Sequence, residues 1–351
     1  MKTDELNYSL PEELIAQEPL DPRDSSRLLL CRRDGSPFVT HIFKDLPDLL
    51  SHGDILITNA ARVMPARLFG YKFPTGARIE VFLLEKLISP DLNNGSRYKA
   101  LLRRRRRLGE GDVILFPESN LIATVIEYAG DDSEIGEDVV ELSGSDDIEG
   151  EIEKIGSVPL PPYIKDYRGD SERYQTIFSR ITGSVAAPTA SLHFTPELLK
   201  RLDEHGIARV EAHLRVGWGT FSPVRTENLE DHRLHEESGE ITSDSADKIN
   251  DARKNGGRAI AVGTTMTRLL ETASDENGII HPFAGPTSLY ITPGYQFHEV
   301  DGLITNFHLP RTSLLALVAA FMGVERTLDA YEFAVTERYR FYSFGDAMLI
   351  L

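Results

Sequence analysis

The sequence predicts a mixed α/β protein: a barrel-like α/β main domain into which a small antiparallel β-barrel domain is inserted. Two changes of pattern carry this prediction. Between residues 66 and 143, short strand-like segments follow one another with no helical periodicity between them. From residue 152 onward, strands alternate with helices, which is typical of an α/β layer or barrel. We therefore predict a discontinuous main domain over 1–62 and 152–351 and an inserted β-barrel domain over 63–151.

The N-terminal piece reads as mixed structure. A short helix or turn (LPEELIAQ, 10–17) comes before the segment PLDPRDSSRLLLCRR, which leads into a strand. A helical segment (FKDLPDLLS, 43–51) then comes before the apolar strand ILIT, which ends at Asn59. The pattern changes after Arg62. Both the strand before that point and the strands after residue 152 are therefore assigned to the main domain.

The inserted domain is predicted from strand-like segments separated by Gly, Pro, Asn and Asp turns, a pattern typical of a small barrel or sandwich. These segments are RLFGYKF (67–73), ARIEVFLLEKL (77–87), RYKALLR (97–103), DVILF (112–116), LIATVIEY (121–128) and DVVELS (138–143). The acidic, Gly-rich stretch 129–151 is predicted to supply surface turns and the exit linker.

The C-terminal part is predicted to alternate between helices and strands. Thr195 and Pro196 are a helix cap and a first helical position for TPELLKRLDEHG, and glycines end that helix and the later SADKINDARKNGG. The intervening and following segments are IARVEAHLRVG, RAIAVGTT, MTRLLETAS, TSLYIT, GLITNF, RTSLLALVAAFMG and TLDAYEFAVTERY.

Composition limits the class of protein. Of 351 residues, 41% are hydrophobic and 26% charged, which is ordinary for a globular chain of roughly two domains. Cys31 is the only cysteine, so an intramolecular disulfide and a thiolate zinc cluster are excluded. Neither a signal-peptide core nor a run of about 18 apolar residues is present. We expect a cytoplasmic protein without a membrane partner.

The formal net charge of −17 argues against indiscriminate coating of nucleic acid, which requires a basic field. One local exception is the run of five arginines, Arg103, Arg104, Arg105, Arg106 and Arg107. Such a run is either a solvated surface or a contact set for phosphates. Both interpretations stay open at this stage.

Polar side chains follow the predicted strands of the main domain, where α/β folds bind their ligands. One strand ends at Asn59 with Arg62 after it, and another ends at Asn306 with His308 two residues later. A third reaches Thr264 and Thr265 with Arg268 one turn on. Each residue alone could be a helix cap or a buried side chain whose hydrogen bonds are made within the protein. Together they predict one ligand-binding site at the strand ends.

The stretch GSVAAPTASLHFT (183–195) combines small residues with Thr189 and His193 directly before a helix start. It has too little apolar bulk for a core strand, so its backbone is suited to approach a ligand. The alternative is a plain loop that leads into a capped helix. The acidic segment with His232 and His235 superficially resembles a metal site, but it lacks an HExxH motif, and we predict no metal.

Several motifs together resemble the S-adenosylmethionine:tRNA ribosyltransferase-isomerase family of queuosine biosynthesis. They run in order from residue 8 to the C-terminus and include RDSSRLL, RVMPARLFG, VPLPPYI with ERYQTIFS, AAPTASLHF, VGWGTFSPV, EDHRLHEE, AVGTTMTRLLE, PGYQF, TNFHLPRTSLLALVAAFMG and YRFYSFGDAMLI. The AAPTA-LHF and TNFHLP motifs are the most specific. The resemblance also implies a barrel-like α/β domain with an inserted small β-barrel.

The resemblance implies the reaction. The family transfers the ribosyl part of S-adenosylmethionine to the 7-aminomethyl group of a 7-deazaguanine wobble base in tRNA. The product is epoxyqueuosine, and adenine and methionine are released. S-Adenosylmethionine is thus a consumed substrate, and no separate cofactor is expected. The implied partner is tRNA with a GUN anticodon that carries the deazaguanine precursor, and we expect a monomer.

The reaction requires proton transfers, for which imidazoles are suited. We hypothesise that His193 and His308 are catalytic and that Arg268 or Arg62 holds the methionine carboxylate. Asn59, Thr189, Thr264, Thr265 and Asn306 are expected to bind ribose or adenine, and Arg103 to Arg107 to contact tRNA phosphates.

Four positions depart from the family pattern, at Ala60, Ala61, Ser191 and Arg215. Arg215 stands where a His precedes VG in relatives, and Arg cannot act as a base at neutral pH; His213 is two residues earlier. These changes leave two alternatives: a divergent enzyme that acts on another nucleoside acceptor, and a tRNA-binding protein without catalytic activity.

Overall fold

The computed structural model describes residues 1–87, 95–104, 108–129, 137–165, 167–217, 224 and 226–351. The chain divides into two compact units. The main unit comprises Met1–Arg62, Pro161–Ile181 and Ala187–Leu351, and the second unit comprises Val63–Leu160 and Thr182–Ala186. The predicted inserted domain was 63–151, whereas the second unit continues to Leu160 and also includes Thr182–Ala186.

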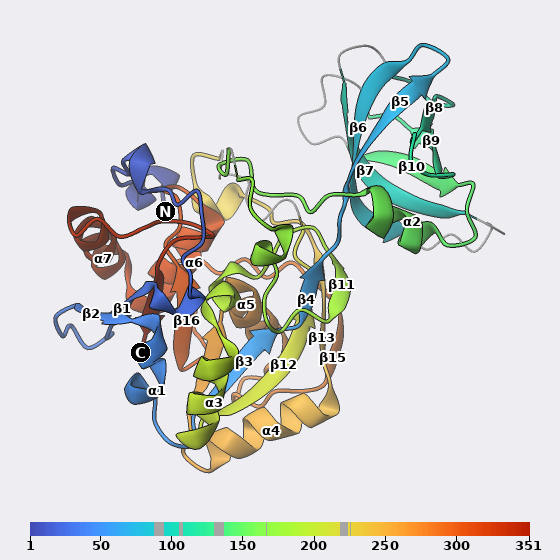
Figure 1. Cartoon of the computed structure of the whole chain (residues 1–351). Helices are drawn as coiled ribbons and strands as arrows, with labels where there is room; N and C mark the ends of the chain where they lie inside the picture. The colour runs from blue at the N-terminus through green and yellow to red at the C-terminus, as the bar shows by residue number, and fades with distance from the viewer. Residues whose placement is uncertain (88–94, 105–107, 130–136, 166, 218–223, 225) are drawn as a thin grey trace. The chain divides into compact units, whose positions relative to one another are not determined.

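The second unit is a closed antiparallel barrel with strand order β10-β7-β6-β5-β8-β9 (Figure 1). Its strands are β5 (Arg67–Phe73), β6 (Ala77–Leu87), β7 (Ser96–Arg104), β8 (Val113–Leu115), β9 (Ile122–Glu127) and β10 (Asp138–Ser143). Alternation along β9 and β10 sends Ala123, Val125, Val140 and Leu142 inward, where they are buried. Gly70 permits close packing, because a Cβ there would lie 2.6 Å from Ile114 Cγ2.

The main unit is built on a nine-stranded sheet with the order β15-β13-β12-β3-β14-β16-β17-β1-β2. Its strands are β1 (Arg27–Cys31), β2 (Val39–Ile42), β3 (Ile55–Asn59), β12 (Ala208–Leu214), β13 (Glu237–Ile241), β14 (Ala259–Val262), β15 (Phe283–Thr287), β16 (Gly302–Asn306) and β17 (Ala347–Ile350). Strands β4 (Ala61–Val63) and β11 (Ile181–Ser184) form a separate two-stranded sheet.

Parallel pairing sets the orientation of the sheet. Strands β12, β3, β14 and β16 are mutually parallel, so their carboxyl ends lie at one edge of the sheet. The C-terminal strand β17 pairs antiparallel with β16 and parallel with β1, which joins the two ends of the chain in one sheet. The central strands β3, β14 and β16 are buried along their whole length, as expected where both faces are covered.

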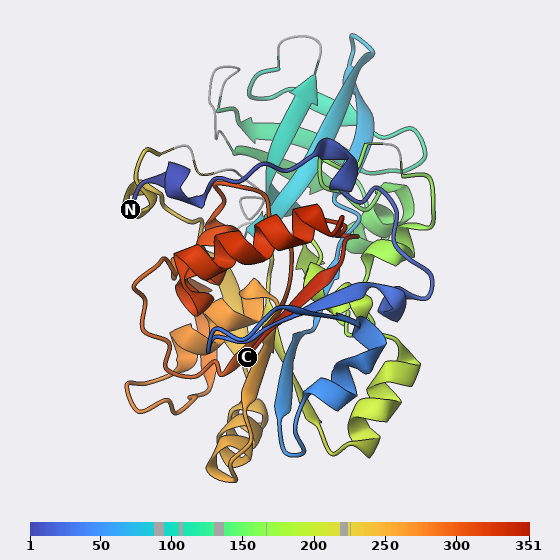
Figure 2. The ribbon, with the colours of Figure 1, turned by 90° about the vertical axis from the view of Figure 1, so that its left-hand side faces the viewer.

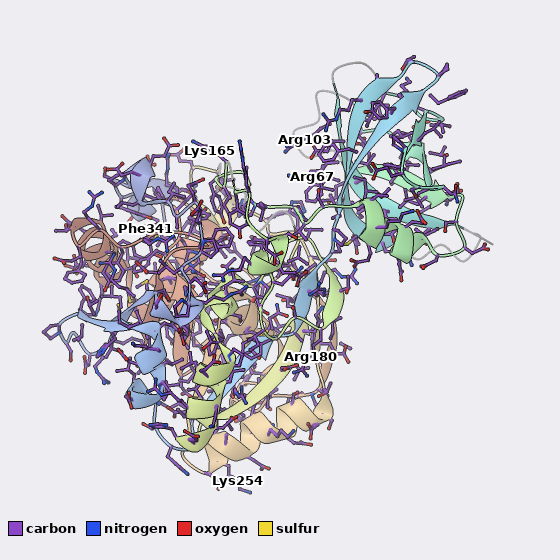
Figure 3. The ribbon with its side chains drawn as sticks, in the orientation of Figure 1. Arg67, Arg103, Lys165, Arg180, Lys254 and Phe341 are labelled. Atoms are coloured by element: carbon purple, nitrogen blue, oxygen red, sulfur yellow. The ribbon has the colours of Figure 1, made fainter. Side chains whose placement is uncertain are left out.

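Helices cover both faces of this sheet (Figures 1 and 2). The helices are α1 (Leu46–Leu49), α3 (Pro196–Glu204), α4 (Ser243–Lys254), α5 (Thr264–Ala273), α6 (Ser313–Met322) and α7 (Val324–Thr336). Apolar residues of α4 to α7 share one core with one face of the sheet, and those of α1 and α3 share a second core with the other face. Figure 3 labels Phe341, which is fully buried in the first core.

Short 3-10 helices lie in the connections: η1 (Thr3–Leu6), η2 (Glu12–Leu14), η3 (Arg23–Ser25), η4 (Phe43–Asp45), η5 (Ser171–Tyr174), η6 (Thr189–His193) and η8 (Leu229–Asp231). The predicted cap at Thr195 is confirmed, since its hydroxyl accepts a hydrogen bond from the Leu198 amide at 3.2 Å. None of the described helices is long and apolar enough to cross a membrane.

The predicted fold class is confirmed: a mixed α/β unit is combined with a small antiparallel barrel. Two local predictions are wrong. The end of the predicted linker forms helix α2 (Ile148–Ile155), which the Asp147 side chain caps and which buries Ile148 and Ile152 one turn apart. TSLYIT is not a strand beyond Thr287, because Thr287 pairs with Glu237, the first residue of the partner strand.

Candidate active site

The candidate active site is a pocket at the carboxyl ends of the parallel strands β14 and β16, with about 510 Å³ of empty space. Three chain segments form most of its wall. Ala187 to Ala190 contribute the start of η6, Gly263 to Thr265 the start of α5, and Thr305 to His308 the end of β16. Val216, Leu314, Tyr163, Tyr342 and Ser343 complete the lining.

Asn306 connects two of these segments. Its Oδ1 accepts a hydrogen bond from Thr189 Oγ1 at 2.9 Å, and its Nδ2 lies 3.2 Å from the carbonyl oxygen of Tyr342. Nδ2 is also 3.4 Å from the carbonyl oxygen of Asp346. Because carbonyl oxygens only accept hydrogen bonds, these contacts fix which end of the amide is the nitrogen. The amide is therefore held in one orientation at the pocket wall.

His193 lies behind Asn306. Its Nε2 is 3.1 Å from Asn306 Nδ2, its Nδ1 is 2.8 Å from Ser26 Oγ, and its ring stacks on Phe43 at 4.8 Å. Since Nδ2 can only donate, Nε2 is the acceptor and Nδ1 carries the proton. Burial, together with the positive charges of Arg340 and Arg23, lowers the pKa of His193 to about 3. The imidazole is thus neutral, and it does not line the Asn306 pocket.

His308, in contrast, lines the pocket. Its Nε2 is 2.9 Å from Thr305 Oγ1, and its backbone is held by Tyr331, whose hydroxyl accepts from the His308 amide at 3.0 Å. Tyr8 donates its hydroxyl proton to the His308 carbonyl at 2.5 Å. Burial lowers the pKa of His308 to about 3, so the imidazole is neutral at pH 7. The Thr305 hydroxyl can accept from or donate to Nε2. In the tautomer in which Nε2–H donates to Thr305, Nδ1 presents a lone pair as a proton acceptor.

The first turn of α5 brings Thr264 and Thr265 to the pocket. Gly263 precedes the helix with φ 94°, a conformation that favours glycine, and no side chain caps this helix end. Thr265 Oγ1 is buried without a hydrogen-bond partner among the described residues. The free amides of a helix N-terminus favour an anion or other acceptor, and the unpartnered hydroxyl beside them is placed to bind one.

Arg268 lines a neighbouring pocket that shares Leu314 with the first. It is four residues after Thr264 on the same helix, so both side chains project from one face of α5. Arg268 Nη1 forms an ion pair with Glu237, and Nε donates to the Leu289 carbonyl at 2.9 Å. Nη2 is buried and has no partner among the described residues. The Nη2 edge of this guanidinium is therefore left for a further hydrogen-bond acceptor.

Asn59 and Arg62 do not join this group. The Asn59 side chain is fully buried and contacts the backbone of Leu214. Asn59 Nδ2 donates to the Leu214 carbonyl at 2.9 Å, and Asn59 Oδ1 accepts from the Leu214 amide at 3.2 Å. Its position at a strand end made it a candidate, but its hydrogen bonds hold β3 to β12. Arg62 forms an ion pair with Glu172, with 2.9 Å between Nη2 and Oε1. Neither residue lines the pocket.

Tyr163, Tyr342 and Ser343 line the pocket, although sequence reasoning gave them no role. The Tyr163 and Tyr342 rings pack edge to face with centroids 4.0 Å apart, and Tyr163 Oη is 2.5 Å from Ser343 Oγ. Tyr342 has φ 72°, a strained conformation for a residue other than glycine. These residues belong to the motifs VPLPPYI and YRFYSFGD, which contributed to the family resemblance but contain no residue that the sequence singled out as catalytic.

The four departures from the family pattern lie outside the pocket lining. Ala60 and Ala61 are buried where β3 continues into β4, and the Ala60 carbonyl accepts from the amides of Arg180 and Ile181. Ser191 Oγ is buried without a partner among the described residues. Arg215 and His213 share the half-buried face of β12 and its continuation, opposite the buried Leu214 and Val216.

The remaining predicted residues belong to other regions. Arg103, labelled in Figure 3, has an exposed side chain on β7, which continues to Arg104. Arg105, Arg106 and Arg107 lie outside the described residues. His232 and His235 follow η8 without regular structure, so they do not share a helical turn; of the two, His235 lines the Arg268 pocket. Among the described residues, no three His, Cys, Asp or Glu side chains gather in a way that could hold a metal ion.

Comparisons with known proteins agree on one family. The profile of the family described as queuosine biosynthesis protein matches residues 3–350. An S-adenosylmethionine:tRNA ribosyltransferase-isomerase of Pelotomaculum thermopropionicum is 49% identical over 351 residues, with full coverage of both chains. A relative of the same name in Moorella thermoacetica is 48% identical over 352 residues, again with full coverage of both.

A solved structure supports the same assignment. The crystal structure of an S-adenosylmethionine tRNA ribosyltransferase from Thermotoga maritima is 33% identical. It covers 99% of this chain and 100% of its own, with a TM-score of 0.55. The chain therefore belongs to the queuosine biosynthesis family of S-adenosylmethionine:tRNA ribosyltransferase-isomerases.

Proposed function

We propose that this protein transfers the ribosyl moiety of S-adenosylmethionine to the 7-aminomethyl-7-deazaguanine base of tRNA, forms epoxyqueuosine and releases adenine and methionine. One observation carries the proposal beyond family membership. The two most specific motifs, AAPTA-LHF and TNFHLP, meet in one pocket through the hydrogen bond from Thr189 Oγ1 to Asn306 Oδ1. Residues of both motifs thus line the candidate site.

S-Adenosylmethionine is proposed to bind across the two neighbouring pockets. The unpartnered Nη2 of Arg268 is suited to the methionine carboxylate, since a charge-assisted hydrogen bond would satisfy a buried donor. Of the two arginines predicted for this role, Arg268 is favoured because Arg62 is engaged with Glu172 outside the pocket. Thr264, Thr265, Thr189 and Asn306 then face the ribose and adenine in the first pocket.

His308 is proposed as the proton acceptor. The sulfonium acidifies the adjacent C5′ protons, and the attacking amine must lose a proton before it bonds to the ribosyl carbon. A neutral imidazole with Nδ1 free can accept either proton. The low pKa makes His308 a weak base in the free protein, so its catalytic form depends on the environment that the bound substrate creates.

His193 is proposed to act through Asn306. The sequence pattern assigned acid–base roles to both histidines, but the two ring nitrogens of His193 are engaged with Ser26 and Asn306. This arrangement supports a positioning role, in which the imidazole holds the Asn306 amide toward Thr189. Asn59 is proposed in the same way to support the wall of the site rather than to touch the substrate.

The RNA partner is proposed to be a tRNA with a GUN anticodon that carries the deazaguanine precursor. Arg103 supports a phosphate contact because its side chain is exposed, and the same role is proposed for the rest of the run to Arg107. We further propose that the protein acts as a monomer and needs no cofactor, since S-adenosylmethionine itself supplies the reactive sulfonium.

The test is incubation with S-adenosylmethionine and tRNA that carries the precursor, followed by mass analysis of nucleosides and detection of adenine. Epoxyqueuosine and free adenine in equal amounts are expected. Adenine release only with a different acceptor would indicate a divergent transferase. Binding of tRNA without adenine release would indicate a non-catalytic protein. Arg268→Gln is expected to weaken S-adenosylmethionine binding about tenfold or more, whereas Arg62→Gln is not.

A further inference from the structure

A second pocket lies on the other side of His193 from Asn306. It has about 280 Å³ of empty space, and its lining includes Arg23, Arg173, Ser26 and His193. Ser343 lines both this pocket and the candidate active site. The two pockets are therefore neighbours within the main unit, separated by the wall that His193 helps to form.

Three guanidinium groups gather at this second pocket. Arg23 is on η3 and Arg173 is on η5, and both line it. The Arg340 guanidinium lies beside it, because its Nη2 donates to the carbonyl of Glu18, the residue before the lining residue Pro19, and its positive charge lowers the pKa of the lining residue His193. Burial and the nearby positive charge of Arg173 lower the pKa of Arg23, in agreement with a crowded cationic site.

These guanidiniums are held mainly by neutral groups. Arg23 donates from Nη1 to the Gln175 carbonyl at 2.7 Å and from Nη2 to the Glu172 carbonyl at 3.2 Å. Arg340 donates from Nη2 to the Glu18 carbonyl. Both guanidiniums are thus positioned by carbonyl contacts. The carboxylates that act on them, Asp21 and Glu172 on Arg23 and Asp346 and Glu18 on Arg340, do so without a direct ion pair among the described residues.

Two donors at this cluster are buried without a hydrogen-bond partner among the described residues: Arg173 Nε and Arg340 Nη1. Arg173 pairs with the carboxylate of Asp21 at 3.3 Å, and the Asp21 side chain is 86% exposed. Leaving a charged donor buried and unsatisfied is costly. An anion with several oxygens would satisfy both donors and balance the charge.

We propose that Arg23, Arg173 and Arg340 form a binding site for a phosphodiester of the RNA substrate, next to the nucleotide that enters the active-site pocket. Arginine is suited to this ligand because its planar fork donates to two phosphate oxygens. In a chain with a net charge of −17, a small cationic site selects one phosphate without attracting nucleic acid in general. The proposal rests on the proposed function only for the identity of the RNA.

The test is equilibrium binding of the tRNA substrate without S-adenosylmethionine, measured over a range of salt concentrations for wild type, Arg173→Gln and Arg340→Gln. Each variant is expected to bind tRNA on the order of tenfold more weakly. The slope of log K against log salt is expected to fall by roughly one phosphate contact. Thermal unfolding of both variants shows whether they are folded, and either folded variant suffices.

Arg209→Gln is the matched control. Arg209 is also half-buried in the main unit, with a side chain 25% exposed against 26% for Arg173, and it pairs with Asp203 at 2.9 Å. This variant is expected to keep wild-type tRNA affinity and salt slope. Wild-type values in folded Arg173→Gln and Arg340→Gln would overturn the proposal.

The affinity for S-adenosylmethionine distinguishes the two possible anions. It is expected to stay within about twofold in both variants, because a phosphodiester site does not hold the methionine carboxylate. A loss of S-adenosylmethionine binding with unchanged tRNA binding would assign the site to that carboxylate and overturn the proposal. Failure of the wild type to form epoxyqueuosine would instead count against the proposed function. The binding results do not require turnover, so they would still test the phosphodiester site.

Discussion

The side chains of His193 and Asn306 are joined by a hydrogen bond of 3.1 Å in which the imidazole Nε2 is the acceptor. Asn306 faces the active-site pocket and receives the Thr189 hydroxyl on its other end. The chain Ser26–His193–Asn306–Thr189 thus runs from the protein interior to the pocket wall. We therefore expect His193 to affect catalysis through the Asn306 amide.

The first prediction tests this chain with a double-mutant cycle. His193→Leu removes the acceptor and is expected to lower kcat on the order of 10²-fold, because a misplaced amide misaligns the substrate. His193→Gln keeps an acceptor and is expected to retain most activity. If His193 acts only through Asn306, the His193→Leu/Asn306→Ala double variant loses no more activity than Asn306→Ala alone. If the activity loss of the double variant equals the product of the two single losses, His193 has a direct role in proton transfer.

The second prediction concerns His308. His308→Gln is expected to lower kcat by about 10²- to 10⁴-fold, the usual contribution of a general base. The S-adenosylmethionine dissociation constant, measured by calorimetry, is expected to change less than about threefold. Thr305→Val removes the hydroxyl that contacts Nε2 and is expected to have a smaller effect in the same direction. Turnover of His308→Gln near the wild-type rate would eliminate this residue as the proton acceptor.

Much of the fold and part of the site follow from the sequence because local signals agree with tertiary contacts. Each predicted strand of the barrel overlaps an observed strand, since alternating apolar residues form its interior. Thr189, Thr264, Thr265, Asn306 and His308 meet as predicted, because parallel strands end at one edge of a sheet. These residues were near strand ends or helix starts, where their direction is fixed by the backbone.

The rest depends on contacts that sequence spacing does not encode. Asn59 also ends a parallel strand, yet its amide is consumed by Leu214, 155 residues away. The partners of His193 come from two distant segments, so its burial and engagement were invisible in a linear motif. Helix α2 was assigned to the linker because its sequence is acidic. The signals for a helix were only the Asp147 cap and two isoleucines one turn apart, Ile148 and Ile152.

The third prediction is a pH dependence of stability. His193 and His308 have pKa values of about 3 in the folded protein, against an ordinary value of 6.5. Below pH 6.5 the unfolded state therefore binds more protons than the folded state, and the free energy of unfolding falls as the pH falls. Each histidine is expected to contribute a loss of about 2 kcal/mol between pH 7 and pH 5.

Chemical denaturation at pH 7 and pH 5 checks this expectation. His193→Gln is expected to show a smaller pH-dependent loss than the wild type, because one neutral buried imidazole is gone. His52→Gln, which changes an exposed side chain, is the control and is expected to keep the wild-type dependence. An unchanged slope in His193→Gln would contradict the assignment of a buried neutral imidazole.

The fourth prediction uses two threonines of helix α5. Thr265 Oγ1 is buried without a partner among the described residues, whereas Thr267 Oγ1 donates to the Gly263 carbonyl at 3.2 Å. Thr265→Val is expected to leave the stability of the free protein unchanged or slightly raised, because no protein hydrogen bond is lost. It is expected to weaken S-adenosylmethionine binding about three- to tenfold, because the hydroxyl then has no ligand atom to bind.

Thr267→Val should show the opposite combination. It removes an intrahelical hydrogen bond at a fully buried position and is expected to lower the free energy of unfolding by about 1 kcal/mol, with S-adenosylmethionine affinity unchanged. Thermal unfolding with and without S-adenosylmethionine measures both quantities in one experiment, since a ligand that binds only the folded state raises the unfolding temperature. Equal ligand-induced shifts in the wild type and Thr265→Val would show that this hydroxyl does not contact S-adenosylmethionine.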